Sequence, residues 1–290
     1  MKASLIILFT LLSSQVLAVR NGVSVDNKYI AELSIKTRSL NSRGSAFGMS
    51  SNSTNTCSGI RIHRNYILTV SHCFKDLRSN GSFTVYYWDK NQQGQDVRYY
   101  AKVYHNNVIK NSILLSEELA LIPIYPTTDS FIEPDIYFGD LTPSKLTFYG
   151  YGMNENGKLG TLRTGELNQS YTKLVDENYM LVTTPGPKNE HPCPGDSGGP
   201  LFKEKDGKDK LFGLVSYINN PNVSLIDEDG KFQCNNANQS HFIILQNHVG
   251  FLKTYMDLGL AEATNLAEKS TSAELILAPT PVEEEIEIED

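Results

Sequence analysis

The sequence predicts an all-β protein, and two observations support that prediction. The 290 residues include 15 Tyr, 12 Phe, 21 Gly and 12 Pro, a composition typical of strands joined by turns. Runs rich in Val, Ile, Thr, Tyr and Phe recur along the chain, at Tyr66–Val70, Phe83–Trp88, Leu146–Tyr151 and Leu211–Val215. Turn formers separate such runs, among them Ser79-Asn80-Gly81, Asn156-Gly157 and Asp206-Gly207. These patterns fit either a barrel or a sandwich.

The first 18 residues have the pattern of a secretory signal peptide. Lys2 is positively charged, residues 5–12 form an apolar run, and Val16-Leu17-Ala18 has the small residues of a cleavage site. The run is too short to cross a bilayer as a helix, and the alternative is an N-terminal segment of the core. No later stretch has eighteen uninterrupted apolar residues. We therefore expect a soluble protein without a membrane anchor, secreted to the extracellular space or periplasm, whose mature form begins at Val19.

The end of the chain changes in character after one helical pattern. Phe251, Leu252, Tyr255 and Met256 have the spacing of a helix. Residues 261–290 contain nine acids and one base, so this segment has a charge of −8, against −7 for the whole chain. Once the signal peptide and its Lys2 are removed, residues 19–260 sum to zero. We expect a solvated, disordered acidic tail over residues 259–290 and no binding to nucleic acid.

Four cysteines in an exported chain predict two disulfides. Three pairings are possible, and pairing nearest neighbours favours Cys57–Cys73 and Cys193–Cys234. A zinc site is the rival interpretation, but neither a Cys-x-x-Cys nor a His-x-x-x-His pair is present. We expect neither a metal nor a cofactor.

Two motifs carry residues for acyl-transfer chemistry. Gly195-Asp196-Ser197-Gly198-Gly199-Pro200 offers a serine nucleophile, with glycines that let the N–H groups of residues 195 and 197 point at one spot. In Thr69-Val70-Ser71-His72-Cys73 a predicted strand leads into a histidine beside a cysteine. His72 could therefore act as the general base for Ser197. Taken alone, Ser197 could be an ordinary loop serine and His72 an ordinary core histidine without a catalytic role.

These motifs resemble those of the trypsin-like, chymotrypsin-fold serine proteases, and the likeness runs from Val19 to about Met256. The serine motif is identical, the histidine motif is similar to Thr-Ala-Ala-His-Cys, and Ser216-Tyr217-Ile218 is similar to Ser-Trp-Gly. The resemblance implies two packed six-stranded antiparallel β-barrels, about 19–128 and 129–258, with a C-terminal helix. It also implies the same two disulfides. By resemblance, Ser197 is the nucleophile, His72 is the base, and Gly195 and Ser197 supply the oxyanion-hole N–H groups.

The third member of the triad departs from the family pattern. The segment similar to Asp-Ile-Ala-Leu is Glu118-Leu119-Ala120-Leu121, so Glu118 is the predicted acid. Glutamate is longer by one methylene, and Glu117 is the alternative acid, one residue out of phase with the strand. The two could also be a solvated pair at a strand start. By resemblance, Asp196 accepts the amino group of Val19, the residue that follows signal cleavage. We therefore expect maturation on export without a separate activation step.

The resemblance also indicates where a substrate side chain would bind. His191 is at the base of the predicted specificity pocket, where trypsin-type enzymes carry Asp, so cleavage after Lys or Arg is not supported. Ile218 stands where the family has glycine, which predicts a shallow pocket, and His241 is placed on the opposite wall. Small apolar and acidic P1 residues are both compatible with this set. Alternatively, His191 faces the core and selects nothing.

These residues predict a secreted serine endopeptidase that hydrolyses protein or peptide substrates through an acyl-enzyme. We expect it to act as a monomer. Two alternatives use the same fold: a catalytically silent, protease-like binding module, which the Glu118 substitution favours, and an esterase-like acyl hydrolase.

Overall fold

The computed structural model describes most of the chain between Gly22 and Met256. The described residues are 22–24, 29–38, 52–75, 77, 81–91, 93–111, 118–124, 131, 133–138, 145–154, 159–175, 180–228, 233–256 and 276–277. The predicted signal peptide, Val19, Glu117 and most of the acidic tail lie outside these residues. No helix among the described residues is long and apolar enough to cross a membrane.

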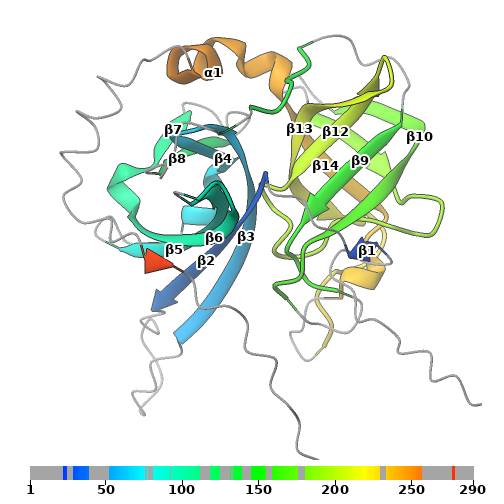
Figure 1. Ribbon diagram of the computed structural model, residues 1–290. Coiled ribbons are helices and arrows are strands. Elements are labelled where there is room, and N and C mark those ends of the chain that lie inside the picture. The colour runs from blue at the N-terminus through cyan, green and yellow to red at the C-terminus, as the bar shows by residue number, and fades with distance from the viewer. Residues whose placement is uncertain are drawn as a thin grey trace, which may run out of the picture.

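The first half of the chain forms one strongly curved antiparallel sheet (Figure 1). Its strands, in the order in which they pair, are β15 (Ile276–Leu277), β6 (Asp96–Tyr104), β5 (Ser82–Lys90), β2 (Ile30–Arg38), β3 (Asn52–His63), β4 (Tyr66–Val70), β8 (Leu119–Pro123) and β7 (Ile109–Asn111). Burial alternates along β5, where Phe83, Val85 and Tyr87 face the core. This period of two is why the aromatic and β-branched run of that segment forms a strand.

The second half forms a closed barrel. Its strands are β9 (Leu146–Gly150), β10 (Arg163–Val175), β11 (Met180–Thr184), β14 (Gln239–Ile244), β13 (Lys208–Asn219) and β12 (Pro200–Lys205), and β10 pairs with β9 to close the ring. The short strand β1 (Val23–Ser24) adds to β10, so the start of the described chain joins the second barrel. Helix α1 (Val249–Met256) follows β14 and the 3-10 turn Leu245–His248.

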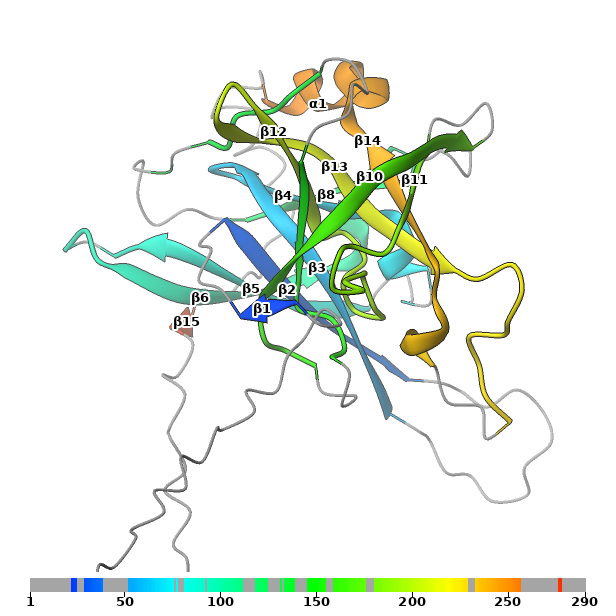
Figure 2. The same cartoon turned by 90° about the vertical axis from the view of Figure 1, so that its right-hand side faces the viewer.

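The predicted fold class is confirmed: two antiparallel β-barrels pack side by side, and the helix comes last (Figures 1 and 2). The sheets have eight and seven strands because short strands at their margins add to the six predicted for each barrel. The tail departs from the expectation at two residues. Ile276 and Leu277 pair with Tyr100 and Tyr99 of β6 instead of standing free in solvent. This pairing covers the edge of the sheet at β6.

Three apolar clusters hold the structure together, one inside each barrel and one between them. Every residue of β4 is buried, because the strand has a core on both of its faces. Ile67 packs inside the first barrel, while Leu68 and Val70 pack in the cluster shared with Leu214 and Ile243 of the second. The strand that leads to His72 is therefore fixed by the contact between the barrels.

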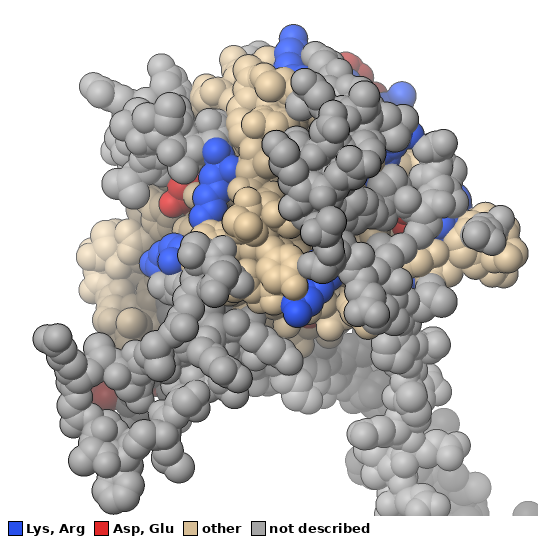
Figure 3. Space-filling view, turned by 90° about the vertical axis from the view of Figure 1, so that its left-hand side faces the viewer, with Lys and Arg blue, Asp and Glu red and all other residues tan. Residues whose placement is uncertain are grey.

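The outer surface of the first barrel carries dispersed charge. Figure 3 shows Lys and Arg side chains at several separate places on this face, with uncharged residues between them. This distribution agrees with a folded body whose formal charges sum to zero.

Candidate active site

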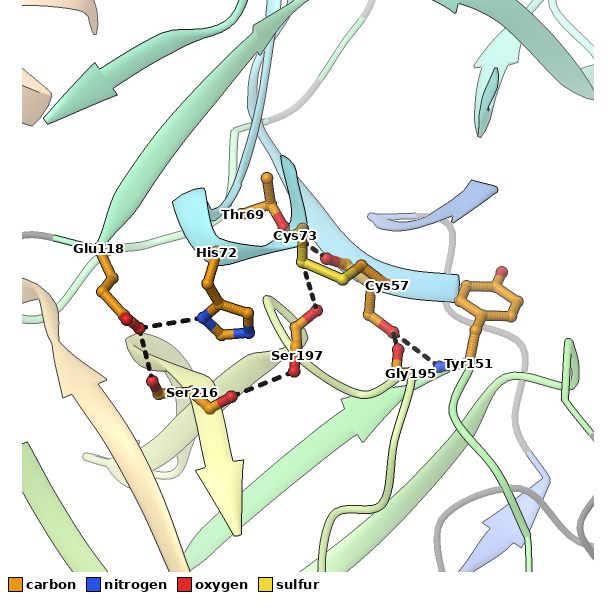
Figure 4. The surroundings of a disulfide bond; sticks show 10 residues. Cys57, Thr69, His72, Cys73, Glu118, Tyr151, Gly195, Ser197 and Ser216 are labelled. Atoms are coloured by element: carbon orange, nitrogen blue, oxygen red, sulfur yellow. Dashed lines mark hydrogen bonds and ion pairs between the residues drawn. A yellow bond between two sulfur atoms is a disulfide. The ribbon is translucent and has the colours of Figure 1, made fainter. Parts of the chain in front are cut away.

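The histidine and the acid come from two neighbouring strands of the first barrel. Strand β4 ends at Val70 and continues into a 3-10 turn, Ser71–Phe74, which contains His72. Val70 pairs with Leu119, the first residue of β8, and the Ser71 N–H donates to the Glu118 carbonyl. The strand pairing therefore places Glu118 beside His72. Their side chains meet, with 3.1 Å between His72 Nδ1 and Glu118 Oε2 (Figure 4).

The carboxylate of Glu118 has a second partner in the other barrel. Ser216 Oγ donates to the same oxygen, Oε2, at 2.8 Å, and Ser216 itself is fully buried. Burial alone would raise the pKa of Glu118, but the hydrogen bonds and charges of its surroundings, foremost those of His72, lower it below its ordinary value. Glu118 is therefore ionised at neutral pH. It can orient the imidazole and stabilise the imidazolium.

Ser197 stands at the edge of the second barrel, on the other side of His72 from Glu118 (Figure 4). Its Oγ donates to the Ser216 carbonyl at 3.1 Å. Among the described residues no hydrogen bond joins this Oγ to His72. The nucleophile must therefore turn about its Cα–Cβ bond to reach the base, and looser catalytic hydrogen bonds of this kind are common in unliganded sites.

The backbone around Ser197 offers two unused donors. Gly195 has a φ of 99°, in the region that favours glycine, and a Cβ there would lie 2.8 Å from the Gly152 Cα. Within the part of the chain that the structure describes, the N–H groups of Gly195 and Ser197 have no acceptor, whereas the next N–H, of Gly198, donates to Val215. Two free N–H groups next to a serine can receive the oxyanion of an acyl-transfer intermediate.

Asp196 is fully buried. Its two carboxylate oxygens accept from the backbone N–H groups of Gly152, at 2.7 Å, and Cys193, at 2.8 Å. Burial raises its pKa to about 7, although these two donors and the charge of Arg163 oppose the shift. Because Val19 lies outside the described residues, its pairing with Asp196 stays a prediction.

Both predicted disulfides are present, Cys57–Cys73 and Cys193–Cys234. The first joins β3 to the turn that carries His72, and the second joins the segment before Ser197 to the segment before β14. Each therefore restrains one of the two motifs found in the sequence.

The structure gives the local contacts of the two predicted specificity histidines. His191 is buried, with Nδ1 2.9 Å from the Pro192 carbonyl and 3.7 Å from Cys234 Sγ. His241 pairs across the strands with Tyr217, and their rings stack with centroids 4.1 Å apart. Cross-strand partners share a face of the sheet, so this register determines where the His241 ring lies. The stack on Tyr217 fixes the position of the His241 ring, and its placement on a wall of the pocket stays a prediction.

The charge on His241 also bears on the specificity. Burial lowers the pKa of His241, and both of its ring nitrogens lack a partner among the described residues. A neutral imidazole cannot attract an acidic side chain by charge. Ser216, predicted to bind substrate, has its side chain engaged with Glu118 and its carbonyl engaged with Ser197 Oγ.

Sequence reasoning missed Ser58. This buried residue of β3 contacts the backbone of both Gly195 and Ser197. No pattern in the sequence marks it, since it follows Cys57 as an ordinary strand residue and its contacts are more than 130 positions away.

Comparisons with known proteins agree with this fold. The family model described as Trypsin matches residues 34–226. Glucanase inhibitor protein 3 of Phytophthora infestans is 29% identical over 183 residues, which cover 56% of this chain and 68% of that protein. Chymotrypsin-like elastase family member 1 of Rattus norvegicus is 24% identical over 189 residues, with the same coverage. Snake venom serine protease 1 of Craspedocephalus gramineus is 26% identical over 181 residues, covering 57% and 68% of the two chains.

A solved structure of HL collagenase shares the fold. Its TM-score is 0.55 at 19% sequence identity, and the match covers 83% of this chain and 100% of the collagenase. With the family model covering about two thirds of the sequence, the chain belongs to the trypsin family, whose members include serine proteases.

Proposed function

We propose that this protein is a secreted serine endopeptidase that uses Ser197, His72 and Glu118. The observation that supports this most directly is the convergence of a histidine–carboxylate pair and two unused N–H donors on one serine. In the proposed reaction Ser197 Oγ attacks a peptide carbonyl carbon, and its proton passes to His72 Nε2. The carbonyl oxygen becomes an oxyanion held by the N–H groups of Gly195 and Ser197.

The remaining steps restore the enzyme. The C–N bond breaks as His72 gives its proton to the leaving amine, and Ser197 is left as an ester of the acyl part. Water then attacks this ester, its proton again passing to His72, and the acid leaves as Ser197 recovers its hydrogen. Glu118 keeps its negative charge throughout and stabilises each transient imidazolium.

The proposed specificity is for a small uncharged P1 residue over Lys or Arg. Ile218 stands in the predicted pocket, and neither of the two histidines is arranged to hold an acidic side chain. A cleavage profile on a peptide library tests this, and dominant cleavage after Lys, Arg, Asp or Glu would contradict it.

Secretion is proposed from the first 18 residues of the sequence. If the signal peptide is removed after Ala18, N-terminal sequencing of the exported protein should give Val19 as its first residue. A start further along the chain would show a separate activation step.

A catalytically silent binding module is the second candidate. Two observations favour it: Ser197 Oγ bonds the Ser216 carbonyl instead of His72, and one relative is named as a glucanase inhibitor. A protein of this kind would bind a partner through the same face without turnover.

Labelling with a fluorophosphonate probe separates the two candidates, because the probe reacts only with an activated serine. The wild type should be labelled, and Ser197→Ala should abolish the label. Ser224→Ala serves as the control, because it removes an exposed serine hydroxyl that, among the described residues, bonds only its neighbour Ile226. This variant should be labelled as strongly as wild type. A folded wild type without Ser197-dependent labelling would refute the peptidase and favour the binding module.

A further inference from the structure

We infer that Ser58 of the first barrel is a positioning residue for the oxyanion hole. This rests on the proposed acyl-transfer function and adds a residue to it. Ser58 is fully buried, and its hydroxyl makes two hydrogen bonds to the second barrel. Oγ accepts from the Tyr151 N–H at 2.8 Å and donates to the Gly195 carbonyl at 2.9 Å.

The directions of these two bonds follow from their chemistry. A backbone N–H can only donate, so Ser58 Oγ must accept from Tyr151. A carbonyl oxygen can only accept, so the one hydroxyl proton goes to Gly195. Both roles of the hydroxyl are thus used within the protein.

Ser58 is also held by its own backbone. Its N–H donates to the Ser197 carbonyl at 2.8 Å, and its carbonyl accepts from Thr69 Oγ1 at 2.8 Å. Thr69 belongs to β4, the strand that leads to His72. Three of the four hydrogen bonds of Ser58 therefore join the strand of the base, the nucleophile and the oxyanion-hole glycine.

The bond to Gly195 fixes the peptide on one side of the oxyanion donor. The Gly195 carbonyl and the Asp196 N–H belong to the same planar peptide unit. Ser58 Oγ holds one end of this unit, and the Cys193 carbonyl holds the other, at 3.0 Å from Asp196 N. Its orientation is therefore set from two sides.

The peptide on the other side is fixed as well. The Pro194 carbonyl accepts from the Met153 N–H at 2.7 Å. In a trans peptide the N–H points opposite to the carbonyl, so this contact directs the Gly195 N–H away from Met153. Gly195, at a φ of 99°, has no side chain to limit its torsions. Its backbone torsions are instead restrained by hydrogen bonds to the Pro194 and Gly195 carbonyls, and Ser58 supplies the second of these.

A role in positioning makes a specific prediction for kinetics. If Ser58 aims the Gly195 N–H at the oxyanion, losing its hydroxyl weakens binding of the transition state but not of the bound ester. Ser58→Ala should slow acylation by p-nitrophenyl acetate about 10- to 100-fold, less than the roughly 10²–10³-fold known for deleting a whole donor. The dissociation constant of the ester complex, from the same stopped-flow series, should change less than about twofold.

Two further variants complete the test. Ser58→Gly removes the same hydroxyl without leaving a methyl group against Gly195, and it replaces the alanine variant if that one does not fold. Thr183→Val is the control, since Thr183 Oγ1 is buried in the second barrel without a hydrogen-bond partner among the described residues. It should acylate at the wild-type rate. Equal losses in Thr183→Val and Ser58→Ala, or a Ser58→Ala loss shared between rate and affinity, would overturn the inference.

Amide hydrogen exchange gives a readout that needs no activity. Without the Ser58 hydroxyl, the Tyr151 N–H loses its acceptor and the peptide that carries the Asp196 N–H loses its restraint. Both N–H groups should exchange about tenfold faster, which corresponds to the loss of one hydrogen bond of ordinary net strength. Thr183→Val should leave both unchanged. If the wild type fails to acylate, the proposed function fails, and this exchange result still decides the role of Ser58: unchanged rates at both amides would refute it.

Discussion

Replacing Glu118 with glutamine tests the departure of this chain from the family's aspartate. The carboxylate lies 3.1 Å from His72 Nδ1, and 23% of the Glu118 side chain and 30% of the His72 side chain are exposed. At that distance, and with an effective dielectric constant of about 20, a carboxylate stabilises an imidazolium by about 5 kcal/mol. Because the imidazolium forms in the transition state, losing the charge should lower the acylation rate by about 10⁴-fold.

An independent value supports this magnitude. In the reference proteases with a Ser-His-Asp triad, exchanging the aspartate for asparagine lowers kcat by about 10⁴-fold. The assay is stopped-flow acylation by p-nitrophenyl acetate, with thermal unfolding to show that the variant is folded. Glu118→Asp should lose about a hundredfold, because its carboxylate retracts by one bond of about 1.5 Å.

The neighbouring glutamate supplies the matched control. Glu117→Gln makes the same chemical change one residue earlier and should leave acylation within about twofold of wild type. If Glu118→Gln retains more than a tenth of the wild-type rate, Glu118 is not the triad acid. A large loss in Glu117→Gln instead would assign that role to Glu117.

Three further predictions concern stability. The folded-state pKa of Glu118 is lowered, so its carboxylate stabilises the fold at pH values above the ordinary glutamate pKa of about 4.5. In urea unfolding, the free energy of unfolding of wild type should therefore exceed that of Glu118→Gln above this pH, and the difference should disappear as the pH falls below it. The pKa of Asp196 is raised to about 7, so the fold should lose up to about 4 kcal/mol relative to Asp196→Asn as the pH rises from about 4 to 7. The same pH change should cost less stability in a chain that begins at Val19, because its terminal ammonium is predicted to pair with the Asp196 carboxylate. An equal loss in the two chains would contradict that pairing. Arg61 and Asp89 form a buried ion pair, with 3.2 Å between Nη1 and Oδ1. Arg61→Met should cost about 3–5 kcal/mol in urea unfolding, and adding Asp89→Leu should recover most of it; no recovery would show that packing of the arginine, not the stranded charge, dominates.

The sequence was informative where function depends on local motifs. The strand before His72, the glycines around Ser197 and the spacing of the cysteines are short-range features, and each led to a residue that the structure brings into the site. The choice of Glu118 over Glu117 rests on the likeness of Glu118-Leu119-Ala120-Leu121 to the family's Asp-Ile-Ala-Leu, and the pairing of Leu119 with Val70 places Glu118 beside His72.

Features that depend on register between distant strands were not predictable in this way. A shift in pairing between Val215 and Tyr217 sets Tyr217 against His241, and the sequence gives no sign of the resulting stack. Ser58 and Gly195 are 137 positions apart, and their contact exists only because the barrels pack as they do. The pairing of Ile276 with β6 likewise needs a sheet edge that an acidic composition cannot reveal.

The packing of the barrels is therefore part of the catalytic geometry. His72 and Glu118 belong to the first barrel and Ser197 to the second, so no single barrel holds the complete set. Besides the shared apolar cluster, two polar side chains bridge the halves: Ser216 reaches Glu118, and Ser58 reaches Gly195. In the proposed mechanism, the first bridge positions the acid and the second positions the oxyanion donor. Both cross the same interface in opposite directions, so a sliding of one barrel on the other would strain both bridges at once.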